Sequence, residues 1–536
     1  MITKILIENF RSIKNLELNT NGLCSLIGPN SAGKTNILKA LDILLGEIYP
    51  TERAFCKDDF FKRDENQQIC IQVWFEDPLE VVKLTKCSGG GKDHCEPISF
   101  RLTHTKNESI SFGATKFSVF DKFGNEFWGS GEARDQLSFV YIPSDRNLER
   151  QMTISKWTLF GKILRKVDEC FRKKEKGENY SRLEEKFREA MKEPKKILES
   201  DIEGELSYKK FKDEFLQVCE DNTRGLTSNF GLNLEIYDPL FYYKTIQIIG
   251  KEELGVFNIE ELGSGVQNLV LLSLFRTYAK LMKNKVVLAI EEPEIYLHPQ
   301  AQRKLYSSFI GLAYPKNKEP GTQIFYTTHN PNFVNALRAD ESTILFKNEN
   351  IGTYKLERSP NVTAEYLEKG KFKIYTHFNT ERNELFFAKK VILVEGDSDK
   401  ILFTTLCKEK WDIDIDKECV SIIECGGKGG VIYFIGVCRL LGIINFFAVW
   451  DEDSEKNCDD KFGSLKCAKS MEKGLEIQGN LEKFLKDKFP DKIFRNKHKV
   501  EDAYKWALNV DENEIPEEFN KMKNFLLSKE KKNNKT

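Results

Sequence analysis

Two groups of carboxylates follow apolar runs in this chain of 536 residues, at places where buried strands are expected to end. The first group, Glu291, Glu292 and Glu294, follows the run Val286–Ile290. A buried carboxylate without a partner is costly, so such a group usually serves a cation or a reaction. Other parts of the chain indicate which of these applies.

The segment Gly28–Thr35, GPNSAGKT, matches the phosphate-binding pattern G-x-x-x-x-G-K-S/T in full. It follows an apolar strand pattern and precedes a helix pattern, a context that a chance glycine-rich turn would not share. Backbone N–H groups and the helix start favour phosphate, Lys34 is expected to reach the terminal phosphates, and the Thr35 hydroxyl is expected to bind Mg²⁺. The predicted ATP-binding residues are Gly28, Pro29, Asn30, Ser31, Ala32, Gly33, Lys34, Thr35 and Asn36.

The acidic group now has an interpretation, because ATPases of this kind place an acidic residue at the end of a second strand. Glu291 occupies that place, where Asp is more usual, and is predicted to act on the metal of ATP. Glu292 is the predicted base that orients or deprotonates the attacking water, while Glu294 and His298 are interpreted as structural. His329 follows another apolar strand and is predicted to contact the γ-phosphate.

A further phosphate contact is predicted in the segment Leu262–Gln267, LGSGVQ, at the start of a long apolar helix. Its backbone N–H groups and the Ser264 hydroxyl could bind a phosphate. Together these motifs resemble the ABC-type ATPases of the SMC and RecF group, in which two heads enclose two ATP molecules. The resemblance implies that Ser264 acts in trans, and Arg11 matches the early arginine of that group. Gln72 is a weak candidate for the glutamine with which the group senses Mg²⁺.

The second group of carboxylates comes from two strand ends, Glu395–Asp399 after the run VILV and Asp451–Asp453 after the run FFAVW. In a parallel sheet these ends meet at the carboxyl edge, so Glu395, Asp399, Asp451 and Asp453 are expected to converge. Oxygen ligands of this density suit Mg²⁺ or Mn²⁺, and two such ions about 4 Å apart can serve both oxygens of a phosphodiester displacement. The alternative is a pair of solvated acidic turns.

This arrangement resembles the TOPRIM fold of topoisomerases, primases and some nucleases. Gly396 matches the small residue after the catalytic Glu, and the glycines of Glu424–Val431 could approach a phosphate. The chain has no room for a domain carrying a strand-breaking tyrosine and no spacing for a zinc module. Nuclease is the TOPRIM activity that remains.

An ATPase of this type followed by TOPRIM resembles the OLD (overcoming lysogenization defect) nuclease family, which includes the ATPase–nuclease subunit of the Gabija system. The segment Arg382–Lys400 is similar to that family's junction into TOPRIM. The resemblance implies a further glutamate and a lysine at the site, for which Glu482 (metal ligand) and Lys499 (catalytic) are the candidates. Alternatives are Glu501, Asp502 and Lys497, and the lysines Lys428, Lys497 and Lys499 could contact the DNA backbone.

The resemblance therefore predicts an ATP-regulated, divalent-metal-dependent DNA endonuclease with a role in anti-phage defence. Its partners would be DNA, further copies of the chain in a dimer or tetramer, and a helicase-like subunit. One rival is a RecF-like repair ATPase that loads other proteins onto DNA. The other is an ATP-dependent scaffold with an inactive TOPRIM unit. The sequence leaves open whether ATP activates cleavage or prevents it.

The expected fold class is α/β: an ABC-type P-loop ATPase head with a helical insertion, followed by a C-terminal TOPRIM domain. Residues 3–28 read as two strands, 34–46 as a helix, and 67–140 as a β-rich lobe. The insertion reads either as a dimerisation arm or as a solvated helical segment. Expected boundaries are 1–150 and 228–350 for the ATPase parts, 151–227 for the insertion, 351–385 for a linker, 386–520 for TOPRIM and 521–536 for a polar tail.

Composition is consistent with this reading. The net charge of −1 means that any binding of nucleic acid depends on local basic patches. The 13 cysteines include no C-x-x-C pair and are expected to be reduced thiols of a cytoplasmic protein. Cys87, His94 and Cys95 could suggest a metal, but a glycine-rich surface loop is favoured. No signal-peptide or membrane-spanning segment is expected.

Overall fold

The structure is a computed structural model in which the chain forms two compact units. The first consists of Met1–Ser144 together with Met282–Thr536, and the second consists of Asp145–Leu281. It describes residues 1–46, 48–106, 115–144, 285–316, 321–357, 381–452, 464–490 and 498–528, with short segments between 189 and 274. Most of the predicted insertion, most of the linker and residues 529–536 lie outside the described residues. Within the described part, none of the helices is long and apolar enough to cross a bilayer.

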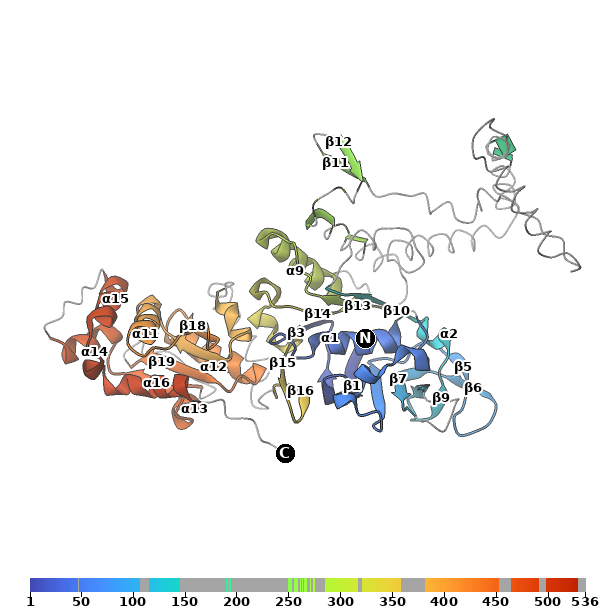
Figure 1. The fold of residues 1–536 in the computed structure, drawn as a ribbon, viewed down its shortest axis with the longest axis horizontal. Helices are drawn as coiled ribbons and strands as arrows, with labels where there is room; N and C mark the ends of the chain where they lie inside the picture. Colours follow the sequence, from blue (N-terminus) through green and yellow to red (C-terminus); the bar gives the residue numbers. More distant parts are fainter. Residues whose placement is uncertain are drawn as a thin grey trace, which may run out of the picture. The chain divides into compact units, whose positions relative to one another are not determined.

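A sheet of 12 strands forms the ATPase part of the first unit (Figure 1). Its parallel half runs in the order β10, β13, β14, β3, β15. β3 and β14 are buried along their whole length, as expected for parallel strands covered on both faces. These strands are β3 (Leu23–Ile27), β10 (Leu137–Ile142), β13 (Lys285–Glu291), β14 (Gln323–Thr327) and β15 (Ser342–Asn348).

The antiparallel half continues from β15 in the order β16, β2, β1, β4, β7, β8, β9. Both strands predicted in residues 3–28 are present as β1 and β3, but the prediction that a turn joins them was wrong, because β2 lies between them and pairs with β1. β16 extends the ATPase sheet beyond residue 350. These strands are β1 (Ile2–Phe10), β2 (Ile13–Asn19), β4 (Ile69–Phe75), β7 (Pro97–His104), β8 (Thr115–Asp121), β9 (Glu126–Trp128) and β16 (Gly352–Lys355).

Helix α1 (Lys34–Leu45) packs on both halves of this sheet, against β1, β4 and β10. Its apolar residues join one core with the antiparallel strands. The helix ends at Gly46, as predicted. There the buried guanidinium of Arg134, at the end of α2 (Gly131–Arg134), donates to the carbonyl of Leu44 at 3.1 Å and so satisfies a helix-end acceptor.

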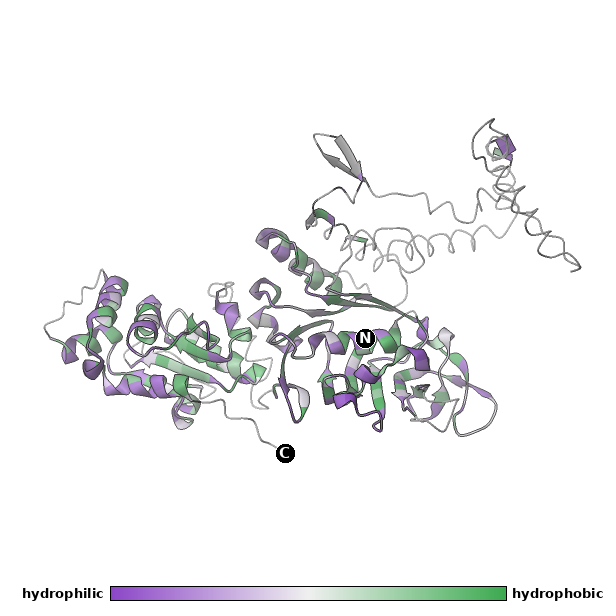
Figure 2. Cartoon of the chain, in the orientation of Figure 1, coloured by the Kyte–Doolittle hydropathy of each residue, from purple (hydrophilic) through white to green (hydrophobic). Residues whose placement is uncertain are grey.

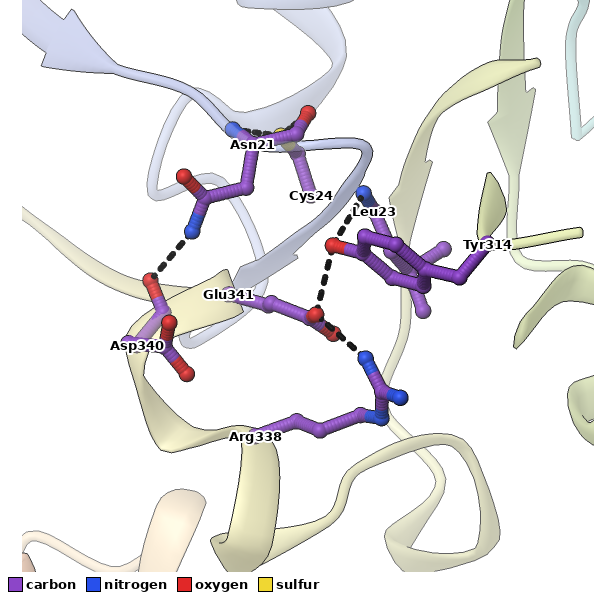
Figure 3. Close-up of polar contacts among 7 residues, drawn as sticks. All are labelled: Asn21, Leu23, Cys24, Tyr314, Arg338, Asp340 and Glu341. Carbon is purple, nitrogen blue, oxygen red and sulfur yellow. Dashed lines mark hydrogen bonds and ion pairs between the residues drawn. The ribbon is translucent and has the colours of Figure 1, made fainter. Parts of the chain in front are cut away.

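The amino ends of the parallel strands are tied together by a polar cluster around the buried Glu341 (Figure 3). The Tyr314 hydroxyl, just after α9 (Pro299–Ala313), donates to Glu341 at 2.6 Å and accepts from the backbone N–H of Leu23 at 3.3 Å. Arg338 donates to the same Glu341 oxygen at 2.6 Å. The cluster connects the starts of β3 and β15 to the end of α9. It therefore lies at the amino ends of the strands, whereas the phosphate-binding loop lies at their carboxyl ends.

The C-terminal part of the same unit, orange and red in Figure 1, is a four-stranded parallel sheet in the order β18, β17, β19, β20. Its strands are strongly apolar (Figure 2), and separate cores cover its two faces. Its strands are β17 (Lys390–Val394), β18 (Val420–Glu424), β19 (Phe446–Asp451) and β20 (Gly474–Ile477). Its helices are α11 (Asp397–Glu409), α12 (Lys428–Leu441), α13 (Ser464–Ser470), α14 (Leu481–Lys488), α15 (Lys499–Asn509) and α16 (Asn520–Leu527).

Helix α16 corrects the expected polar tail at 521–536. Met522 and Leu526, one turn apart, are buried in the core that also contains residues of α11 and α15. Lys390, at the start of β17, donates to the Leu526 carbonyl. The folded C-terminal domain therefore extends at least to residue 527.

The remaining elements are short. The hairpin of β5 and β6 contains His94 and Cys95, and no cluster of three or more His, Cys, Asp or Glu side chains fit to hold a metal is found there or elsewhere among the described residues. The hairpin of β11 and β12 belongs to the second unit. Their bounds are β5 (Val82–Thr85), β6 (Lys92–Cys95), β11 (Ile249–Glu252) and β12 (Gly255–Asn258). The 3₁₀ helices are η1 (Glu52–Ala54), η2 (Lys57–Asp59), η3 (Phe61–Arg63), η6 (Pro331–Phe333), η7 (Ala336–Glu341), η8 (Arg382–Phe386), η9 (Glu512–Glu514) and η10 (Glu517–Phe519).

Candidate nucleotide and metal sites

The predicted phosphate-binding loop joins β3 to α1, and two of its glycines are required by their surroundings. Gly28 has a φ of +151°, and a Cβ there would lie 2.2 Å from the Leu345 carbonyl oxygen. Gly33 has a φ of +101°, and its Cβ would lie 2.2 Å from Thr353 Oγ1. Larger residues would force the loop away from β15 and β16. The exposed tip, Pro29–Ser31, faces solvent.

Asn36 has a supporting position beneath this loop. Its amide nitrogen donates to Ser12 Oγ at 2.8 Å, and Ser12 Oγ lies 2.7 Å from Thr353 Oγ1. Thr35, one residue earlier, is half-buried in the first turn of α1. Asn36 therefore holds the loop against β16, while the metal-binding role of Thr35 stays a prediction.

Lys34 is buried, with 6% of its surface exposed, and its ammonium donates to the carbonyls of Gly28 at 2.8 Å and Pro29 at 2.9 Å. Burial lowers the pKa of Lys34 to about 8, against the opposing influence of Glu292 and Glu294. A buried ammonium beside exposed backbone N–H groups fits a polyphosphate, which would supply the missing negative charge.

Glu291 ends β13 and is buried, with 3% of its surface exposed. One carboxylate oxygen accepts from the Tyr141 hydroxyl and the other from the Ser144 backbone N–H, both at 2.9 Å. The sequence prediction assigned this carboxylate to the metal of ATP. In the structure its two oxygens bind the end of β10, contacts that the sequence gave no reason to expect.

Glu292 lies at a turn with a φ of +41°, which is unusual for a residue other than glycine. Its N–H donates to the carbonyl of Thr327 at 3.0 Å and to the hydroxyl at 3.1 Å, so the end of β14 holds this conformation. Such local strain is typical of functional sites.

His329 and Glu294 complete this neighbourhood. The carboxylate of Glu294 accepts from the His329 N–H at 2.9 Å and from the Thr328 hydroxyl at 2.7 Å. Burial raises the pKa of Glu294. Partial burial, then the charge of Lys34, lower the pKa of His329, while Glu292 opposes them. Lys34, Glu292, Glu294 and His329 thus interact electrostatically at one edge of the sheet.

Other residues predicted for the ATPase lie elsewhere or outside the described residues. Gln72 is buried in the antiparallel half, where it bonds Ser99 and Arg101 at 2.8 Å. Arg11 donates to Asp59 at 2.7 Å. Ser264 lies outside the described residues, although the N–H groups of Val266 and Gln267 donate to the Gly263 carbonyl.

The second group of carboxylates lies at the carboxyl edge of the C-terminal sheet, as the sequence predicted from parallel strands. β17 and β19 pair in parallel, and the backbone N–H of Asp451 donates to Glu395 Oε1 at 2.7 Å. Asp399 lies in the first turn of α11 and is 6% exposed, and its carboxylate accepts from the Gly396 N–H at 3.0 Å.

These carboxylates perturb one another. The pKa of Asp399 lies well above its usual value because of burial and the charges of Asp451 and Glu395. Burial raises the pKa of Asp451 to about 7, and Glu395 and Glu482 add to the shift, whereas Lys499 opposes it. The cluster therefore carries more negative charge than one lysine neutralises, which is the environment that a divalent cation stabilises.

Glu482 and Lys499 join this cluster from α14 and α15. The Lys499 ammonium lies 3.2 Å from Glu482 Oε1. Of the alternative residues, Glu501 pairs with Lys505, and Asp502 is buried in α15. Lys497 lies outside the described residues.

The donor set fits Mg²⁺ or Mn²⁺ because it consists of carboxylate oxygens alone. Asp453, the remaining predicted ligand, lies outside the described residues. Among those described, no three of the carboxylates close around a single point as finished ligands. Electrostatic coupling, and not a closed ligand cage, is therefore the observation that supports a metal site here.

Lys428 has a different position from the one expected of a DNA contact. Its ammonium donates to the backbone carbonyls of Asp451 at 2.8 Å and Glu452 at 3.1 Å. This lysine therefore fixes the end of β19, where the carboxylates begin.

Matches to family models also separate the chain into an ATPase part and a TOPRIM part. The model described as AAA ATPase domain matches residues 1–127 and 130–334. The model described as overcoming lysogenization defect protein-like TOPRIM domain matches residues 386–453. Because the first match covers more than half of the chain, the chain belongs to the AAA ATPase domain family, and its second domain is a TOPRIM domain of the OLD type.

The relatives that match most of the chain are named as nucleases. The chain is 28% identical to the OLD nuclease of Thermus scotoductus over 464 residues, which are 84% of this chain and 82% of that protein. It is 22% identical to the Old nuclease of Escherichia phage P2 over 82% of this chain and 75% of that protein. It is 23% identical to Endonuclease GajA of Bacillus cereus over 76% of this chain and 68% of that protein. The predicted resemblance to this family is confirmed.

Among solved structures, the Smc head domain with an extended coiled coil from Pyrococcus furiosus matches 69% of this chain and 99% of its own, with 14% identity and a TM-score of 0.38. A likeness at this score adds nothing to the assignment. The family match, the sheet order and the position of the phosphate-binding loop carry it.

Proposed function

We propose that this protein is a divalent-metal-dependent DNA endonuclease whose activity is regulated by ATP. The observation that carries the proposal is the group of mutually repelling carboxylates at the edge of the TOPRIM sheet, with Asp451 at a pKa of about 7 beside Lys499. The ATPase and TOPRIM matches within this chain, and the nuclease names of its relatives, also support the proposal.

In the TOPRIM site, the metal would be held by Glu395, Asp399, Asp451, Asp453 and Glu482. Two bound Mg²⁺ or Mn²⁺ ions would supply an activated water and stabilise the attacking and leaving oxygens of the phosphodiester. Asp451 must lose its proton before it can act as a ligand. Lys499, beside Glu482, is placed to stabilise the negative charge that develops on the phosphate.

In the ATPase site, Gly28–Thr35 would hold the phosphates, with Lys34 as their counter-charge and Thr35 on the Mg²⁺. Glu292 would orient or deprotonate the attacking water, and His329 would contact the γ-phosphate. Glu291, which holds the end of β10, would act on the metal only if it exchanged a present partner for a metal-bound water. Ser264 of a second copy would complete the site.

The DNA substrate, a dimer or tetramer of this chain and a helicase-like partner remain predictions from the resemblance, as does a role in anti-phage defence. The name endonuclease belongs to the Bacillus cereus relative, and its extension to this chain is part of the proposal. Basic side chains such as Lys499 would make DNA binding weaker as salt rises.

The test is cleavage of supercoiled plasmid by the purified full chain, with Mg²⁺, Mn²⁺ or EDTA, and with or without ATP. Glu395→Ala and Asp451→Ala are measured beside the wild type. Asp414→Asn, an exposed carboxylate in the same domain, is the matched control.

We expect nicking or linearisation that requires the metal, is lost in both site variants and persists in the control. Cleavage that survives Glu395→Ala and Asp451→Ala would overturn the assignment of the site. No cleavage of plasmid or of single-stranded DNA, together with ATP turnover stimulated by DNA, would favour the rival function of a loader.

A further inference from the structure

We propose that η8, and Asn383 and Arg382 within it, couple the ATPase site to the TOPRIM site. The inference rests on the proposed function, because it names the residues through which bound nucleotide would regulate cleavage. It assigns them no part in chemistry: Asn383 and Arg382 are positioning residues that touch the surroundings of both sites.

The first contact is with the loop that carries His329. Asn383 is buried, with 8% of its surface exposed, and its amide nitrogen donates to the carbonyls of Pro331 at 2.7 Å and Val334 at 3.1 Å. These two carbonyls belong to η6 and the residue after it, two and five positions beyond His329. A shift of His329 toward a γ-phosphate would therefore move the groups that Asn383 holds.

The His329 loop is itself tied together, so that it can move as one piece. The side-chain amides of Asn330 and Asn332 both donate to Gln302 Oε1, at 2.9 and 3.0 Å. The buried Tyr326 hydroxyl donates to the Phe333 carbonyl at 2.6 Å. These bonds keep η6 attached to α9 and β14, on the edge where Glu292 and Lys34 lie.

The second contact is with the TOPRIM domain. Arg382, also 8% exposed, forms an ion pair with Glu424, the last residue of β18. Glu424 in turn accepts from the Gly426 N–H at 2.6 Å. The pair is partly buried, so the loss of one partner would leave the other charge incompletely solvated.

The loop after β18 then binds both strand ends that carry the proposed metal ligands. The Gly427 N–H donates to the backbone carbonyl of Glu395 at 2.8 Å. Lys428 donates to the carbonyl of Asp451 at 2.8 Å, and the Asp451 N–H donates to the Glu395 carboxylate. A displacement of Glu424 would therefore change the spacing of the carboxylates.

Apolar packing follows the same route. Ile27, the last residue of β3 before the phosphate-binding loop, lies in one buried cluster with Val334, Leu385, Phe386 and Val431 of α12. Close-packed interiors transmit displacements because they have little free volume to absorb them. Hydrogen bonds and core therefore connect the two sites through the same short helix.

One group in η8 points to a second arrangement. The amide oxygen of Asn383 is buried and accepts no hydrogen bond from the described residues. Buried acceptors are nearly always satisfied, so this oxygen would be satisfied either by water or by an arrangement of η8 that brings it a donor. Nucleotide could shift the population toward that arrangement.

The test compares initial cleavage rates with and without ATP for the wild type, Asn383→Ala and Glu424→Gln. Glu424→Gln keeps an acceptor for Gly426 but weakens the pair with Arg382. The matched control is Gln323→Ala, because the buried Gln323 amide also donates to two carbonyls, at 2.7 and 2.8 Å, but at the amino end of β14.

Coupled sites typically change each other's affinity for ligands by about 5- to 150-fold. In the wild type we expect ATP to raise or lower the cleavage rate. In Asn383→Ala and Glu424→Gln we expect the rates with and without ATP to differ by no more than about twofold. ATP binding and nucleotide-free cleavage should be retained, and Gln323→Ala should keep the wild-type ratio. If the variants that fold keep the wild-type ratio, or if the wild type cleaves DNA at a rate that ATP does not change, the coupling is wrong.

A second readout separates this proposal from the proposed function. Hydrogen exchange at the Gly426 and Gly427 amides is followed with and without a non-hydrolysable ATP analogue. We expect a nucleotide-dependent change in the wild type that is lost in Asn383→Ala and in Glu424→Gln. Should the protein show this change but no cleavage, the nuclease assignment fails while the coupling stands. If no change occurs at these amides, the coupling is overturned even where DNA is cleaved.

Discussion

The two sites of this chain treat charge in opposite ways. In the ATPase part a single buried ammonium, that of Lys34, is held by two backbone carbonyls and flanked by Glu292 and Glu294. In the TOPRIM part several carboxylates face one another beside the ammonium of Lys499, and the pKa of Asp451 is about 7. The first site is organised before a ligand arrives, whereas the second has an excess of negative charge that only cations or protons relieve.

This difference indicates which charge each ligand must bring to its site. Phosphate would add negative charge to a loop whose lysine ammonium already lies against the loop backbone. The carboxylate cluster instead competes with protons for its cations, because Asp399 and Asp451 both favour the protonated form. The ATPase part should therefore respond to nucleotide, and the TOPRIM part to metal and pH, through separate residues.

The largest expected effect is the loss of cleavage in Asp451→Asn. Asp451 would hold a cation that stabilises the reacting phosphate, and loss of one such electrostatic contribution typically costs about 100- to 1,000-fold in rate. ATP binding should not change, since Asp451 belongs to the other site. Initial cleavage rates and equilibrium ATP binding are measured on the same preparation, with Asp414→Asn as the control. A matching loss of ATP binding would show that the two sites are not separate.

The complementary change is Lys34→Ala, which should weaken ATP binding by about 10- to 100-fold, the effect of losing a hydrogen bond to a charged group. Nucleotide-free cleavage should stay at the wild-type level. Equilibrium binding of a fluorescent ATP analogue measures the first and plasmid nicking the second. Unchanged affinity in this variant would contradict the role of the loop.

Metal binding at the TOPRIM site should strengthen as pH rises to 7. The pKa of Asp451, raised to about 7, means that a proton must leave before a cation binds, so affinity for the cation should rise about tenfold per pH unit below 7.

The same raised pKa of Asp451 means that the metal-free folded state binds more protons than the unfolded chain. Its thermal stability should therefore fall as pH rises from about 4 to 7, and less so in Asp451→Asn. A pH-independent affinity would contradict this pKa.

ATP binding should show the opposite dependence. The pKa of Lys34, lowered to about 8, means that the ammonium begins to lose its charge in mildly alkaline solution. Affinity for ATP should fall about tenfold per pH unit above 8, because the neutral Lys34 amine must then take up a proton when ATP binds. Lys34→Arg is the control, since arginine stays charged over this range. A wild-type profile as flat as that of the arginine variant would be against the assignment.

The smallest effect is expected far from either site. Tyr314→Phe removes the hydroxyl that joins Glu341 to Leu23 (Figure 3). It should lower the free energy of unfolding by about 1–3 kcal/mol, because two buried groups lose a partner. Denaturant unfolding measures this, and cleavage and ATP binding at 25 °C should not change. A change in either activity would show that the cluster contributes to function.

Local motifs were the part of the molecule that the sequence predicted best. Gly28–Thr35 is contiguous, so its strand, loop and helix could be assigned together. The meeting of Glu395 and Asp451 followed from the rule that parallel strands end at one edge. By contrast, β2 and α16 were missed because each buries only a narrow set of residues, in α16 Met522 and Leu526, among polar neighbours.

Contacts between distant residues were not predictable. The bonds of Glu291 to Tyr141 and Ser144 join residues 150 and 147 positions apart, and no local pattern signals them. Asn383 binds carbonyls 52 and 49 positions away, and an asparagine that binds backbone has no signature in sequence. Only the folded chain reveals these partners.

The most direct measurement is binding of Mn²⁺ to the nucleotide-free protein, followed by electron paramagnetic resonance. We expect bound Mn²⁺ in the wild type and in Lys34→Ala, and a loss of Mn²⁺ binding in Asp451→Asn. If Asp451→Asn binds Mn²⁺ as the wild type does, the carboxylate cluster is not the metal site and the central claim is contradicted.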